Sequence, residues 1–148
     1  MKRSLILAAA ALALYPDLAW GAASCSASAT VISFGTINPF GSAVTSNGTI
    51  TVACSNGQNS ATYTIALSTG GSGSYANRQV KNGTQTMNYN LYTTTALSTI
   101  WGDGTGGTST VTGTDTRTTK TFTVYGQITP APVTPNTYSD SITVTVTY

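Results

Sequence analysis

The C-terminal run of the chain alternates polar and apolar residues without interruption from residue 141 to residue 148. Side chains on a β-strand point alternately to opposite faces, so Ile142, Val144, Val146 and Tyr148 share one face. We therefore predict a half-buried strand here. Because the pattern reaches the last residue of the chain, we expect this strand to keep a free edge to which another chain can add a strand.

The same alternation recurs along the chain and predicts further strands, with no helix. The predicted strands cover residues 27–34, 48–54, 61–67, 87–92 and 118–125, which makes six with the terminal strand. Turn signals separate them, namely Asn47-Gly48, Asn56-Gly57, Asn82-Gly83, a Gly/Ser loop over residues 69–74 and a proline-rich connection over residues 130–135. The glycine-rich residues 101–115 read as a long surface loop. Together these features predict an all-β fold, an antiparallel β-sandwich.

Composition limits the function classes. The 148 residues suit one domain, and only 7% of them are charged, with no Glu and no His. Outside the N-terminal segment four basic residues face three acidic ones, a net charge of 4 − 3 = +1, from Arg78, Lys81, Arg117 and Lys120 against Asp103, Asp115 and Asp140. Nucleic acid is therefore an unsuitable partner, since binding phosphates needs clustered Lys and Arg.

The N-terminus has the pattern of a secretory signal. Lys2 and Arg3 precede an apolar run over residues 5–14, and small residues follow at 19–23. The apolar run is too short to span a bilayer, which takes about 20 residues. We expect residues 1–23 to be a cleaved signal peptide, cut after Gly21 or Ala23, and residues 24–148 to be one exported domain without a membrane span.

The chain has two cysteines, Cys25 and Cys54. In an oxidising compartment, an even count in a small exported domain predicts a disulfide. A zinc site is disfavoured because it needs about four ligands, and the chain offers no His.

The residues that chemistry would need are also scarce. Without His or Glu, no nucleophile–base pair and no pair of catalytic carboxylates can be assembled, so we expect a non-enzymatic protein without a cofactor. Trp101 and Asp103 lie in a Trp-Gly-Asp-Gly stretch that suits either a surface contact with a ligand or a turn whose Trp packs on the rim of the sandwich. The sequons at Asn47 and Asn82 fit hairpin turns more simply than glycosylation.

In order along the chain, several segments resemble the spore coat protein U domain family, which includes pilin subunits of archaic chaperone–usher pili. The segments are Phe34-Gly35, Asn38-Pro39-Phe40-Gly41, Ile50-Thr51-Val52-Ala53-Cys54, Tyr63-Thr64-Ile65-Ala66-Leu67, Asn88-Tyr89-Asn90-Leu91-Tyr92, Trp101-Gly102-Asp103-Gly104, Val124-Tyr125-Gly126-Gln127-Ile128 and Tyr138-Ser139-Asp140. The resemblance implies an immunoglobulin-like sandwich that lacks its seventh strand. A periplasmic chaperone stabilises such a subunit, an outer-membrane usher assembles it, and another pilin subunit completes it by donating a strand.

Strand addition needs a groove with an exposed edge and pockets for alternate side chains. The candidate groove residues are Ala29 and Val31 on one wall and Ile142, Val144, Val146 and Tyr148 on the other. The alternative is that these are ordinary core positions of a closed sandwich.

The chain departs from the pilin pattern at its N-terminus, where Cys25 follows the predicted cleavage zone by only a few residues. This spacing predicts a subunit that accepts a strand without donating one, which places it at the tip of a surface fibre with a role in adhesion or biofilm formation. The alternative function is a free-standing secreted coat or ligand-binding module.

Overall fold

The structure, a computed structural model, describes residues 24–55, 60–115 and 117–148. The predicted signal peptide and the Asn56-Gly57 turn lie outside these residues. The described strands are β1 (Ser24–Ala29), β2 (Val44–Ser55), β3 (Ala61–Leu67), β4 (Arg78–Asn82), β5 (Gln85–Tyr92), β6 (Val111–Asp115), β7 (Thr119–Ile128) and β8 (Val144–Thr147), with a short 3₁₀ turn η1 at Gly70–Ser72.

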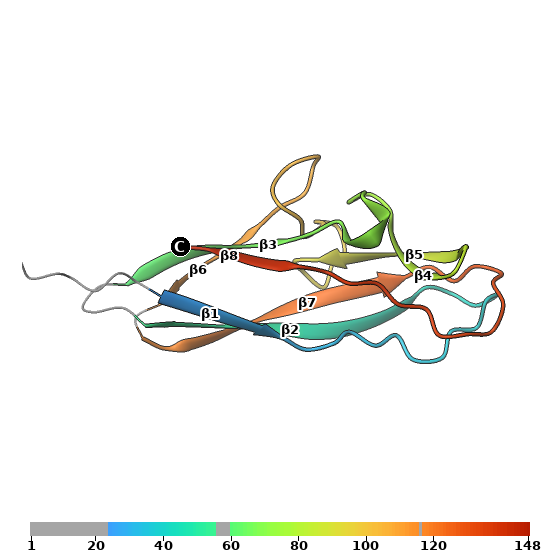
Figure 1. Cartoon of the computed structure of the whole chain (residues 1–148), viewed down its shortest axis with the longest axis horizontal. Coiled ribbons are helices and arrows are strands. Elements are labelled where there is room, and N and C mark those ends of the chain that lie inside the picture. The colour runs from blue at the N-terminus through green and yellow to red at the C-terminus, as the bar shows by residue number, and fades with distance from the viewer. Residues whose placement is uncertain (1–23, 56–59, 116) are drawn as a thin grey trace, which may run out of the picture.

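The strands form two antiparallel sheets that face each other (Figure 1). One sheet has the order β1-β2-β7-β5-β4, and the other has the order β6-β3-β8. The registers place Ile50 opposite Phe122 and Ile65 opposite Val146. Each pairing between two of these described strands is antiparallel, as expected for neighbours in an immunoglobulin-like sandwich. This confirms the predicted fold class.

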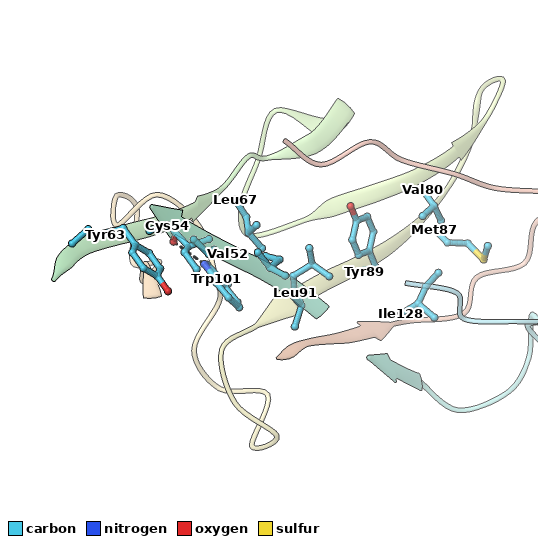
Figure 2. Packing of buried hydrophobic residues seen from close by; sticks show 14 residues of the cluster. Val52, Cys54, Tyr63, Leu67, Val80, Met87, Tyr89, Leu91, Trp101 and Ile128 are labelled. Atoms are coloured by element: carbon cyan, nitrogen blue, oxygen red, sulfur yellow. Dashed lines mark hydrogen bonds between the residues drawn. The ribbon is translucent and has the colours of Figure 1, made fainter. Parts of the chain in front are cut away.

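The core lies between the two sheets and is built from alternate residues of each strand. The predicted inward rows are buried, including Ile50 and Val52 on β2 and Tyr63, Ile65 and Leu67 on β3. Figure 2 shows Leu67 reaching down from β3 while Tyr89 and Leu91 of β5 rise toward it. Each large aliphatic side chain buried in this way contributes about 1.5–3 kcal/mol relative to an exposed one.

A disulfide joins Cys25 to Cys54, as the sequence predicts. The two residues are direct partners in the register of β1 and β2, so the bond fixes the edge strand β1 to its neighbour. The sequence separation is 29 residues, for which the chain-entropy argument gives about 3–4 kcal/mol of stabilisation.

The sequence analysis did not predict two of the described strands, β4 and β6. β4 carries Arg78, Gln79 and Lys81, and so lacks the apolar alternation that marks a strand. β6 lies inside residues 101–115, so the prediction of one long surface loop there was wrong. Its Gly113 pairs with Tyr63 of β3 and leaves room for the tyrosine ring, because a Cβ at Gly113 would lie 2.6 Å from the Tyr63 hydroxyl oxygen.

The start of the sandwich also differs from the prediction. Asn47 and Gly48 lie within β2 rather than in a hairpin turn, whereas Asn82 and Gly83 do turn the chain between β4 and β5, with Gly83 at φ 58°. The predicted first strand over residues 27–34 ends early. Thr30 still donates its N–H to the carbonyl of Thr49 at 2.9 Å, and the chain then leaves β2.

The terminal strand begins later than predicted, at Val144. Just before it, Ser139 forms a bridge with Lys81 of β4, and Asn82 donates to the Thr137 carbonyl at 2.7 Å. The segment after the proline-rich connection, at residues 137–139, therefore runs along the outer edge of β4 before the chain crosses to β3. This crossing brings residues 133–144 to the same side of the molecule as β1.

Candidate functional site: a groove between the strap and β8

β1 and β8 are the edge strands of their sheets, and they run along the same side of the molecule (Figure 1). The two strands are in contact with each other. A groove with two walls begins at Ala29, the last residue of β1. One wall is residues 31–37, here called the strap, and the other is residues 133–144. The space between them is a groove of about 880 Å³.

The floor of the groove is apolar and belongs to the sandwich core. It is formed mainly by inward side chains of the five-stranded sheet, together with Leu67 of β3. Figure 2 shows several of these side chains standing in one row from Leu91 to Met87. The floor residues are Ile50, Leu67, Val80, Met87, Tyr89, Leu91, Val124 and Ile128. A ligand that fills this groove therefore needs apolar side chains on one of its faces.

The strap is attached to the sandwich through side chains. A Cβ at Gly48 would lie 2.6 Å from Cγ1 of Ile32, and a Cβ at Gly126 would lie 3.0 Å from Cζ of Phe34. The Phe34 ring also packs at 6.2 Å from the ring of Tyr89. Ile32 and Phe34 thus occupy notches that two glycines leave on the inner face of β2 and β7.

The strap and β8 each have a backbone edge that no described strand pairs with. Within the described residues, no backbone hydrogen bond joins residues 31–37 to another segment. β8 pairs with β3 along one edge, and no described strand pairs with its other edge. An extended chain placed between them could exchange main-chain hydrogen bonds with both walls while its alternate side chains met the floor.

Four of the six predicted groove residues line this space, namely Ala29, Val31, Ile142 and Val144. Val146 is half-buried against the core and Tyr148 is 57% exposed, and neither lines the groove. Val146 lies on β8, which contacts β1, whereas the lining of the groove ends at Val144.

The sequence analysis missed the contribution of Ile32 and Phe34, although their spacing of two was visible. It also missed Asp140, which lines the groove together with Tyr89. Among the described lining residues, Asp140 is the one that carries a charge. Its Oδ2 accepts a hydrogen bond from the Tyr89 hydroxyl at 2.7 Å. Burial and this hydrogen bond raise the pKa of Tyr89, so the hydroxyl keeps its proton.

The Trp101 stretch does not form a surface site. Trp101 is 1% exposed, and its indole N–H donates to the Ile65 carbonyl at 3.0 Å, so its prediction as a surface contact was wrong. Its apolar ring is large enough to fill the core once the N–H has a partner. Asp103 is exposed, and its carboxylate accepts hydrogen bonds from the N–H and the hydroxyl of Thr105, which lower its pKa.

Other kinds of site find little support in the geometry. Among the described residues, no three Cys, Asp, Glu or His side chains gather closely enough to hold a metal ion. The part of the chain that the structure describes contains no helix with the length and hydropathy that a bilayer crossing requires.

A comparison of the sequence with protein families gives one match. The family described as Spore Coat Protein U domain matches residues 11–145. The chain belongs to the Spore Coat Protein U domain family. No curated protein matches its sequence.

Among solved structures, this Spore Coat Protein U domain is similar to a chain of the CsuC–CsuE chaperone–tip adhesion subunit pre-assembly complex from archaic chaperone–usher Csu pili of Acinetobacter baumannii. The TM-score is 0.62 at 19% identity, over 86% of this chain and 40% of that one. At this identity the match supports the fold. The Spore Coat Protein U domain spans less than half of the length of its structural relative.

Proposed function

We propose that the chain is a structural, non-enzymatic subunit of a secreted surface fibre of the chaperone–usher type, and that it accepts a donated β-strand. The observation that carries this proposal is the groove between the strap and β8, with two unpaired backbone edges and an apolar floor. An exposed edge above an apolar groove is what strand addition requires, and it is a liability for a protein that stays alone.

Family membership and the fold shared with a chaperone-bound pilus subunit support the same partners for this chain. They are a periplasmic chaperone, an outer-membrane usher and other pilin subunits. A route through the periplasm to the cell surface follows from those partners and from the predicted signal segment. The position at the fibre tip, with adhesion or biofilm formation as its role, stays a prediction, because the residues ahead of Ser24 lie outside the described part.

Expression of the exported protein with and without a periplasmic chaperone encoded beside it tests the proposal. Alone, the protein should aggregate or be degraded, because the unpaired backbone edges beside the groove can pair with strands of other chains. With the chaperone, it should be recovered as a soluble heterodimer. A chaperone-free monomer that stays soluble and unfolds cooperatively would favour the free-standing secreted module instead.

A further inference from the structure

The inward row of side chains on the wall formed by residues 133–144 contains one charged residue among apolar ones. Residues 140, 142 and 144 alternate along the chain, and Asp140, Ile142 and Val144 all line the groove. Along the chain, a carboxylate is thus followed by two apolar side chains. A strand that pairs with this wall would place successive inward side chains about 6.6 Å apart, twice the rise per residue, and one of them would come to lie beside Asp140.

The carboxylate of Asp140 is held in place. Oδ1 accepts hydrogen bonds from the N–H of Gly71 at 2.8 Å and from the N–H of Ser141 at 2.9 Å, while Oδ2 accepts from Tyr89. Gly70 makes room for this arrangement, because a Cβ there would collide with the carboxylate. Three hydrogen bonds fix its orientation and leave capacity for about one more, since a carboxylate accepts about four.

The nearby basic side chains use their donors on other groups. Arg78 donates to the carbonyls of Ser68 and Trp101 and to the side chain of Asn90. Lys81 donates to the carbonyl of Gly71 at 2.7 Å. The negative charge of Asp140 therefore faces a groove whose other described lining residues are uncharged.

We propose that Asp140 determines which strand the groove accepts and in which register. The residue of the donated strand that faces Asp140 carries a hydrogen-bond donor or a positive charge, whereas the residues that face Ile142 and Val144 are apolar. An acidic residue at the position that faces Asp140 is excluded, because the two negative charges would repel each other in a poorly hydrated groove. This inference rests on the proposed function, since it specifies the ligand of the same groove.

The test uses the full exported protein, released from its chaperone in the presence of peptide. The parent peptide has about 14 residues of alternating valine and threonine, long enough to cover the groove. In the panel, each valine in turn is replaced by lysine, asparagine or aspartate. At one position, which is the one that faces Asp140, we expect lysine and asparagine to be tolerated. Aspartate at the same position should weaken binding by at least about tenfold relative to lysine. At the other valine positions all three replacements should weaken binding.

The variant Asp140→Asn is nearly isosteric. Its amide oxygen can keep the hydrogen bonds from the N–H groups of Gly71 and Ser141, and its NH2 group can donate to the Tyr89 hydroxyl oxygen. It should reduce the preference for lysine over aspartate to less than about threefold at that position and leave the other positions unchanged. If this variant fails to fold, the salt dependence of the wild-type protein decides, because the preference should shrink at high ionic strength.

The outcomes separate the two claims. If the parent peptide binds but no position distinguishes lysine from aspartate, the role of Asp140 is wrong and strand acceptance stands. If neither the parent nor any other peptide binds, the proposed function fails, and this inference fails with it.

Discussion

At the scale of single residues, the fold depends on polar groups that are buried with their partners. Arg78 is fully buried, and its guanidinium connects β4 to the carbonyls of Ser68 and Trp101, with the Tyr75 ring 5.3 Å from it. Asp115 is also fully buried, and its carboxylate accepts hydrogen bonds from Thr118 and from the N–H of Cys54. Buried polar groups of this kind stabilise a fold chiefly because losing one partner leaves the others unsatisfied.

Replacing Arg78 by methionine should therefore lower the free energy of unfolding by about 2–4 kcal/mol, because buried carbonyl groups lose their donor. Lys120, which is exposed on β7, provides the matched control. Its change to methionine should stay within about 0.5 kcal/mol. Urea unfolding of both variants measures the difference, and equal losses would argue against the role given to Arg78.

The acid sensitivity of the protein should depend on Asp115. Burial alone raises the pKa of this carboxyl, but the hydrogen bonds from Thr118 and Cys54 outweigh burial and lower the pKa below its usual value. The stabilisation from a lowered pKa is complete above the unfolded-state value of about 4 and is lost as the pH falls through the native value. Thermal unfolding of the wild-type protein should therefore show falling stability below about pH 4.

The comparison of Asp115→Asn with Asp103→Asn identifies the responsible group. Asp115→Asn should be less stable than the wild-type protein at neutral pH, and its stability should fall less steeply below about pH 4. Asp103 is exposed, so its interactions are screened by solvent and its replacement should change the profile less. A larger flattening in Asp103→Asn than in Asp115→Asn would refute this assignment.

At the scale of elements, the strap is held to the sandwich by side chains. Its backbone has no hydrogen bond to another described segment, and Ile32 and Phe34 anchor it in the notches at Gly48 and Gly126. An element held in this way belongs to the part of a fold that opens most readily. The disulfide at Cys25 keeps β1 in place even when the strap moves.

Gly48→Ala should displace the strap, because its Cβ would lie 2.6 Å from the side chain of Ile32. We expect a loss of about 1–3 kcal/mol, the usual effect of overpacking. In the background Ile32→Ala the same substitution should cost much less, since the notch is then empty. A double-mutant cycle by urea unfolding measures this coupling, and additive effects would show that the two residues do not compete for one space.

At the scale of the whole molecule, the alternation of apolar residues was enough to predict the sandwich and its inward rows. The alternation did not predict β4, because an arginine such as Arg78 is interpreted as a surface residue when its buried partners on three other segments are unknown. It failed at Gly48 for a related reason, since a glycine that makes room for a distant side chain looks like a turn signal. Asp140 was missed because its place in the groove depends on Gly71 and Tyr89, which are remote in sequence.

The groove itself was predicted only in part. Four of its residues followed from strand faces, but the position of its open section depended on where β1 leaves β2 and where the chain crosses from β4 to β3. Both events are set by tertiary contacts, the packing of Ile32 on Gly48 and the bridge of Ser139 to Lys81. Neither contact leaves a periodic signal in the sequence.

The central claim is that an extended chain fills the seam between the strap and β8 with main-chain hydrogen bonds. Hydrogen–deuterium exchange of the exported protein, with and without the alternating peptide, tests it most directly. We expect amides of residues 31–37 and of residues 140–144 on the facing wall to gain protection by at least about tenfold, while the opposite edge of the three-stranded sheet, at β6, stays unchanged. Peptide binding that protects β6 instead, or that leaves both walls of the groove unprotected, would contradict the claim.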